Sequence, residues 1–328
     1  ALISFLLATP QRAQAQTRKA YVAQSADKTT LTFYYDVLRS TRTGTTWGIE
    51  ETKKEEDDTF PAWAGTDKVA DRLTARVVFD ASFRDFRPTS TAWWFCHYRA
   101  LKQIEGLEYL NTSEVKDMSS MFWGCSALTS LDLKNFNTQN VTDMSSMFYD
   151  CVALTSIDLK NFNTQNVTDM SWMFYRCSAL KSLDLKNFNT KNVTNMSWMF
   201  CDCVALTSLD LKNINTQNVT NMSGMFSDCA ALKSIDLKNF NTKNVTNMSH
   251  MFLGCTSLTS LDLKNFNTKK VTNMYEMFSG CAALRTINSN TTWQCQVSKD
   301  MFAGCTKLKG AVAYDKNKVD AKMANPET

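Results

Sequence analysis

One segment of about 26 residues is written repeatedly through the middle of this chain. Val115, Val141 and Val167 are each 26 positions apart, and columns of methionine, phenylalanine, cysteine and leucine keep the same step. A fixed period of this length is typical of solenoids, in which each repeat is one structural unit stacked on the next. The period therefore predicts about eight coils between residues 93 and 310, with Phe95 in a degenerate first copy.

The valine column has eight members, although the last copy is two residues short in its later part, so that Met301 and Cys305 come early. The column is Val115, Val141, Val167, Val193, Val219, Val245, Val271 and Val297. One copy alone would gain about 18 kcal/mol by burying its apolar side chains. Ordering its backbone and side chains costs on the order of 40 kcal/mol. A single coil cannot fold, so the coils must stack and share apolar faces.

Two short patterns predict the local structure of each coil. Leu128-x-x-Leu131-x-Leu133 has the spacing of leucine-rich repeats and predicts a short strand with its leucines inward. Met118-x-x-Met121 places one apolar stripe on a single helical or 3₁₀ turn. The predicted fold class is α/β, a leucine-rich-repeat solenoid with a parallel β-sheet face and short helical or 3₁₀ turns, capped by a small β-rich N-terminal region.

The flanking sequence divides the chain further. We expect a signal-peptide remnant at 1–15, a β-rich cap at 16–92, the solenoid at 93–310, and a polar, frayed and truncated tail at 311–328. The short apolar run before Ala13-Gln14-Ala15 favours a secretory signal over an ordinary apolar helix. No apolar stretch approaches the roughly 20 residues of a membrane-spanning helix. The protein is thus expected to be secreted or displayed at the cell surface.

The cap is predicted to cover the open end of the solenoid, and the alternative is an independent binding domain. Residues 30–35 and 76–79 alternate as strands do, while the charged run 53–58 is interpreted as a solvated loop.

Eleven cysteines suggest disulfides in an exported protein, but most of them occupy one column of the repeat. That column is Cys125, Cys151, Cys177, Cys203, Cys229, Cys255 and Cys281. Parallel Cβ vectors suit disulfides poorly, so a stack of small buried thiols is favoured. Cys201 and Cys295 lie off the column and are expected to be reactive or paired. A zinc site is not expected, because there is no C-x₂-C pair and there are only two histidines.

Aspartates and lysines form two neighbouring outward columns. They are Asp132, Asp158, Asp184, Asp210, Asp236 and Asp262, and Lys134, Lys160, Lys186, Lys212, Lys238 and Lys264. Stacked carboxylates suggest calcium, but calcium needs many oxygens and no ammonium neighbours. Charge balance between the two columns is the favoured interpretation.

Asn-Val-Thr recurs as a formal glycosylation sequon at Asn140, Asn166, Asn192, Asn218 and Asn244. Because each sequon has the same place in its coil, side-chain-to-backbone bonding in a turn is the better explanation.

No catalytic constellation can be defended around His97 or His250, and the chain has neither a phosphate-binding loop nor a block of positive charge. We therefore expect no enzyme activity, no cofactor, no metal and no nucleic-acid partner.

The positions that vary between copies are the candidate binding residues. Before the second methionine stand Trp172 and Trp198, and after the phenylalanine stand Tyr149 and Tyr175. Grouped aromatics of this kind form either a contact patch or rings that simply lie on the coil surface. The predicted binding surface adds the neighbouring charged face, namely Asp158, Lys160, Asp184, Lys186, Asp210 and Lys212.

The repeat Asn-Val-Thr-Asp-Met-Ser-x-Met-Phe-x-x-Cys-x-x-Leu-x-x-Leu-Asp-Leu, with the lead-in EGLEYLNT at 105–112 and Pro88-Thr89-Ser90-Thr91, resembles that of BspA-like leucine-rich-repeat surface proteins of bacteria. The resemblance covers residues 80–328 most strongly. It implies an exported surface protein that mediates adhesion to a host matrix protein or another surface macromolecule, and it brings no catalytic residues. The alternative is a passive spacer or envelope component that presents another domain.

Overall fold

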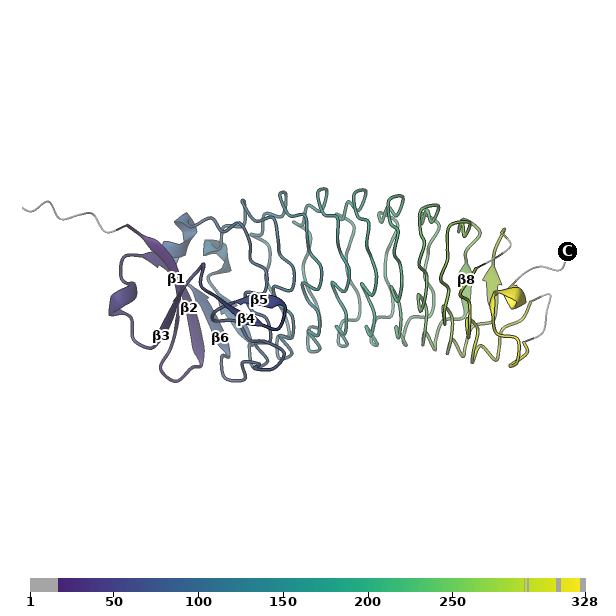
Figure 1. Cartoon of the computed structure of the whole chain (residues 1–328), viewed down its shortest axis with the longest axis horizontal. Coiled ribbons are helices and arrows are strands. Elements are labelled where there is room, and N and C mark those ends of the chain that lie inside the picture. Colours follow the sequence, from purple (N-terminus) through teal and green to yellow (C-terminus); the bar gives the residue numbers. More distant parts are fainter. Residues whose placement is uncertain (1–16, 292, 294, 311–313, 325–328) are drawn as a thin grey trace, which may run out of the picture.

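The computed structural model describes residues 17–291, 293, 295–310 and 314–324. The chain forms a long row of stacked coils with a small β-sheet at its N-terminal end (Figure 1). The strands are β1 (Lys19–Gln24), β2 (Thr30–Asp36), β3 (Thr45–Gly48), β4 (Thr52–Glu55), β5 (Asp58–Pro61), β6 (Arg76–Phe79), β7 (Gln103–Glu105), β8 (Ser260–Asp262) and β9 (Thr286–Asn288). The 3₁₀ helices are η1 (Arg39–Thr41), η2 (Ala81–Asp85), η3 (Leu107–Tyr109) and η4 (Ala321–Ala324).

The N-terminal sheet has the strand order β3-β1-β2-β6-β7 and confirms the two strands expected near residues 30 and 76. β1 pairs antiparallel with β2 and β3, whereas β6 pairs parallel with β2 and β7. Leu31 and Val77 face each other in this register and are fully buried. The sheet packs into the same continuous apolar core as the coils. The N-terminal signal expected at 1–15 lies outside the described residues.

The charged run 53–58 is not the solvated loop expected from its composition, because it lies in the antiparallel hairpin of β4 and β5. Two anchors explain the difference. Phe60 is buried, and the Lys53 ammonium donates a hydrogen bond to the carbonyl of Ala64. The hairpin lies against the first coils, as Figure 1 shows.

The coils are joined mainly along the segment that precedes each column cysteine. In one coil the N–H groups of Met170, Trp172, Phe174 and Arg176 donate to the carbonyls of Asn195, Ser197, Met199 and Cys201, over 2.8–3.1 Å. Trp172 and Arg176 have φ values of 60° and 56°, in the left-handed region. A right-handed helix excludes such residues, so the predicted helical or 3₁₀ turn is wrong. The segment is a run of tight turns because alternate N–H groups point to the next coil.

The leucine segment also differs from its prediction. Leu131 and Leu133 are buried as expected, at 8% and 1% exposure. Among the described coils, however, only β8 and β9 pair there as parallel strands. The aspartate bond does not explain this difference, because Asp158 accepts the N–H of Lys160 and Asp262, in β8, likewise accepts that of Lys264. A continuous parallel β-sheet face is therefore wrong, and parallel bridges form instead at the column that begins with Asp117 and Asp143.

Phenylalanine rings form the spine of the core. Phe148, Phe174 and Phe200 are buried, and successive ring centroids lie 5.5 and 5.8 Å apart. Valines from Val115 to Val271 are buried beside them, but Val297 is 45% exposed and pairs with Asn273. The prediction that Val297 continues the valine column is wrong, because the two-residue deletion shifts the frame before it.

Threonine side chains close the opposite edge of each coil. Thr190 is fully buried, and its hydroxyl donates to the Asn215 carbonyl at 2.8 Å while accepting the Asn215 N–H at 2.8 Å. The same pair of bonds recurs at Thr112, Thr138, Thr164, Thr216 and Thr242. Each threonine thus satisfies two backbone groups of the following coil.

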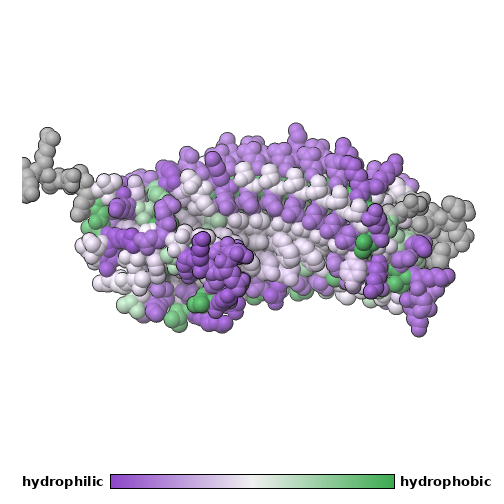
Figure 2. Space-filling view, in the orientation of Figure 1, coloured by the Kyte–Doolittle hydropathy of each residue, from purple (hydrophilic) through white to green (hydrophobic). Residues whose placement is uncertain are grey.

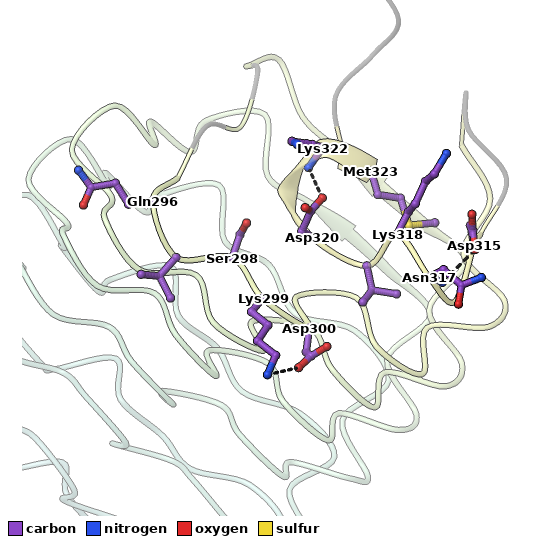
Figure 3. A pocket seen from close by; sticks show the side chains of 12 residues that line it. Gln296, Ser298, Lys299, Asp300, Asp315, Asn317, Lys318, Asp320, Lys322 and Met323 are labelled. Carbon is purple, nitrogen blue, oxygen red and sulfur yellow. Dashed lines mark hydrogen bonds and ion pairs between the residues drawn. The ribbon is translucent and has the colours of Figure 1, made fainter.

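The segment 314–324 packs on the last coil, whereas a frayed tail was expected. The Phe302 N–H donates to the Val319 carbonyl at 2.9 Å, and Ala321 is buried. An open pocket of about 840 Å³ lies between this segment and the last coil, and Figure 3 shows its charged rim, where Lys299 approaches Asp300. The rim mixes both signs of charge, so it favours neither an anionic nor a cationic ligand.

Candidate functional site

A ladder of rings runs along the outside of the coil stack, and it contains all four aromatic residues predicted from the sequence. Trp172 stacks on Trp198 with centroids 5.2 Å apart, and Tyr149 stacks on Tyr175 at 4.5 Å. Tyr149 also joins the two pairs, since its ring lies 6.0 Å from that of Trp172. All four side chains are partly buried. We call the whole series the aromatic ladder, formed by Trp93, Trp123, Tyr149, Tyr175, Trp172, Trp198, His250 and Tyr275.

The backbone explains why these positions vary. Trp172 and Trp198 have φ near 60° and occupy the place that Ser120, Gly224 and Glu276 hold in other coils. Their N–H groups bond to the next coil, so the main chain is fixed whatever side chain projects from it. This freedom lets the sequence place rings where the fold itself does not need them.

Gly224 keeps the aromatic ladder continuous where one coil lacks a ring. A Cβ atom at this glycine would lie 2.2 Å from the Trp198 ring. The ring therefore lies over the glycine and reaches His250, with centroids 5.6 Å apart. Trp93, Trp123, His250 and Tyr275 extend the ladder beyond the four predicted residues. His250 and Trp123 stand in the variable columns of Trp172 and Tyr149, which was the signal for them.

The aspartate–lysine columns form a separate stripe on the leucine segment. Asp158 pairs with Lys160 at 3.1 Å, and the same pairing within one coil recurs at Asp132–Lys134, Asp184–Lys186, Asp210–Lys212 and Asp236–Lys238. Charge balance is thus confirmed for these five pairs. Bonds from lysine N–H and ammonium groups lower the pKa of each carboxyl of the predicted surface, with the backbone bond the largest cause at Asp158 and Asp184 and the ammonium bond the largest at Asp210. The structure does not bring this stripe together with the rings.

Unbalanced carboxylates flank the aromatic ladder, and the sequence patterns did not single them out. Asp117, Asp143 and Asp169 follow one another in successive coils. Burial raises the pKa of Asp143, and the charges of its two neighbours raise it further. On the other side of the ladder, burial and the charge of Asp228 raise the pKa of Asp202.

Asparagine stands at the same column position in later coils, such as Asn221, and its Oδ1 accepts the same backbone N–H that Asp143 accepts. We therefore expect Asp143→Asn to raise the thermal midpoint at pH 7 by about 1 °C. A raised carboxyl pKa favours the protonated folded form, so ionised Asp143 costs stability as pH rises above its ordinary titration range. The gain should disappear in scans at acid pH, where Asp143 is protonated in both states.

The control for that measurement is Asn221→Asp, which adds a carboxylate between the neutral Asn195 and Asn247. The new carboxylate of this variant should lower stability through burial alone, without repulsion from charged neighbours in the adjacent coils. A lower midpoint for Asp143→Asn at pH 7 would contradict the expectation.

The cysteine column is a stack of buried free thiols, as predicted. The Cys177 thiol donates to the Phe148 carbonyl at 3.2 Å, and equivalent bonds of 3.0–3.2 Å link every column cysteine from Cys125 to Cys305 to the preceding coil. Cys201 and Cys295 are also free, so the prediction of pairing is wrong. Burial raises the pKa of Cys201, which opposes a reactive thiolate. Reactivity of the half-buried Cys295 stays a prediction.

The sequon asparagines bond to backbone, as expected, but between coils instead of within a turn. Asn192 Nδ2 donates to the Gln165 carbonyl at 2.7 Å. The other four make the same bond to the preceding coil at 2.7–2.8 Å.

Within the described ranges, no group of three or more histidine, cysteine or acidic side chains is placed to hold a metal ion. None of the helices in those ranges is long and apolar enough to cross a membrane.

A protein family described as "Mycoplasma protein of unknown function, DUF285" matches residues 89–209 and 202–315, which together include the whole row of coils. The chain belongs to this family. For the DUF285 chain, no curated protein gives a match. The family description does not name BspA-like proteins.

Several solved structures are similar to the DUF285 chain at low identity. A leucine rich cell surface protein from Faecalibacterium prausnitzii A2-165 is 16% identical, with 92% of this chain and 99% of that chain covered and a TM-score of 0.27. A leucine-rich repeat protein from Eubacterium ventriosum is 14% identical, with 90% and 89% covered and a TM-score of 0.31. The pneumococcal vaccine antigen PcpA is 11% identical, with 88% of each chain covered and a TM-score of 0.27.

Proposed function

We propose that this protein is an exported, BspA-like surface protein that binds another macromolecule through the aromatic ladder and so mediates adhesion. Export rests on the signal-like pattern of residues 1–15. Binding rests on one observation: rings with no role in the spine of the core form a continuous, partly exposed series over consecutive coils. Aromatic side chains supply large contact area at low entropic cost, which is why they dominate many binding surfaces.

The stack suits this role because it holds the rings at fixed spacing. Trp172 and Trp198 project from backbone that is bonded to the next coil on the same residues. A rigid row of similar contacts binds a long partner with little loss of conformational freedom. Catalysis is not part of the proposal.

The test is a binding panel of matrix proteins, glycans and bacterial cells, with the folded full chain and its Trp172→Ser/Trp198→Ser variant. We expect the wild type to adhere to at least one ligand, and the affinity of the variant for that ligand to be lower by about tenfold or more, because two aromatic contacts are lost. A control variant on the charged stripe, Lys160→Ala/Lys186→Ala, separates the two predicted surfaces. Unchanged adhesion in the tryptophan variant, with circular dichroism showing an intact fold, overturns the proposal and favours a passive spacer.

A further inference from the structure

The face that carries the aromatic ladder is strongly acidic, although the whole chain has a formal charge of +4. We define the acidic-aromatic face as the five segments 117–124, 143–150, 169–176, 195–202 and 221–228. Their charged residues are Asp117, Asp143, Asp150, Asp169, Arg176, Asp202 and Asp228. Six aspartates and one arginine give this face a formal charge of −5.

Among the described residues, most of these carboxylates form no ion pair. Arg176 lies 3.1 Å from Asp150, which balances one carboxylate. Among the residues that the structure describes, neither Asp202 nor Asp228 forms an ion pair, in contrast to the paired aspartates of the leucine segment. Uncompensated charge concentrated on one face attracts a partner of the opposite sign and suppresses others.

The hairpin of β4 and β5 already covers the N-terminal end of the aromatic ladder. Phe60 of β5 meets Trp93 edge to face, with ring centroids 4.9 Å apart, and the Trp93 ring in turn lies 5.3 Å from that of Trp123. Beyond Trp123, the rings from Tyr149 to Tyr275 make their ring–ring contacts with other ladder rings among the described residues. Figure 2 shows a pale band of weakly polar residues that begins beside the hairpin and continues along the coils between more hydrophilic rims.

The distance between stacked rings of the aromatic ladder favours one shape of partner. Trp172 and Trp198 stack with ring centroids 5.2 Å apart. This distance is close to the advance of one turn of an α-helix, about 5.4 Å. Residues on one face of an extended strand repeat every 6.7 Å or so and fall out of step within a few coils. Apolar residues on successive turns of a helix along the long axis can therefore each meet one of these two tryptophan rings.

We propose that the acidic-aromatic face binds a cationic amphipathic α-helix of a partner protein, lying along the long axis of the coils. This inference rests on the proposed function and names the class of its partner. Apolar residues of the helix, one per turn, would pack on the rings of Trp172 and Trp198. Lysines or arginines on its flanks would pair with Asp202 and Asp228 and lie over the faces of the rings.

The test uses three synthetic peptides of about 20 residues, titrated into the full chain while tryptophan fluorescence and peptide circular dichroism are recorded. The first has leucine and lysine in helical periodicity, the second has the same composition in strict alternation, and the third has glutamate in place of lysine. We expect the first peptide alone to bind and to gain helicity, with an affinity that falls as salt is added.

Asp202→Asn/Asp228→Asn is expected to weaken that binding about tenfold, whereas the matched control Asp132→Asn/Asp236→Asn on the leucine segment leaves it unchanged. Equal binding to both variants, or preferred binding of the alternating peptide, overturns the inference. If the panel finds a ligand that depends on Trp172 and Trp198 but the lysine helix does not bind, the inference fails and the proposed function stands. If the tryptophan variant loses no ligand of any kind, both fail.

Discussion

Replacing Phe174 with alanine is expected to lower the free energy of unfolding by about 3–5 kcal/mol, the usual cost of removing a buried phenylalanine. The ring is fully buried between Phe148 and Phe200, with interplanar angles of 12° and 1°. Its loss opens a cavity in the middle of the spine, where neither neighbouring ring can move without leaving its own stack. Each coil contacts chiefly its neighbours, so the damage should begin locally.

Urea titration followed by circular dichroism measures the total loss, and hydrogen exchange locates it. Exchange should accelerate first in the coils on either side of residue 174. Phe174→Leu is the matched control, since it keeps most of the volume and should cost far less. A Phe174→Ala variant as stable as the wild type would show that the spine does not hold the coils together.

The second large effect is expected for Thr190→Val, which should cost about 2–4 kcal/mol. Valine keeps the shape of threonine but removes the hydroxyl that both donates to and accepts from the backbone of Asn215. The Asn215 N–H and carbonyl would lose their partner at this closed edge, and an unpaired buried polar group costs more than the bond it once made.

Thr190→Ser retains the hydroxyl and is the comparison for this measurement, made by chemical denaturation of all three proteins. We expect serine to recover most of the stability. If the valine variant is as stable as the wild type while the serine variant is destabilised, the methyl group matters more than the hydroxyl and the hydrogen-bond explanation is wrong.

The sequence predicted which positions are equivalent, because equivalence is what a period measures. Columns such as Phe148, Phe174 and Phe200, or the cysteines with their buried thiols, could be listed without any structure. Val297 deviates: it is 26 residues after Val271, but it pairs with Asn273 because two residues are missing before it. Periodicity counts residues, and it takes no account of a deletion within the last copy.

How equivalent positions bond could not be predicted in the same way. Serine, tryptophan, glycine, histidine and glutamate share one left-handed position, so no glycine signature marked the tight turns. Leucine alternation suggested strands, but among the described coils only β8 and β9 pair as strands there. The aromatic part of the candidate site was predicted because its residue types vary between copies. The flanking carboxylates, such as Asp143 and Asp202, were missed because no pattern sets them apart from charge-balanced aspartates.

The hydrogen bond from each column thiol to the coil before it has a practical consequence. A sulfhydryl reagent can reach Cys177 only when its coil separates from the one that holds Phe148. The modification rate at each sulfur therefore measures how often one particular pair of coils opens. The column thus provides a built-in probe of local opening at each coil–coil junction along the stack.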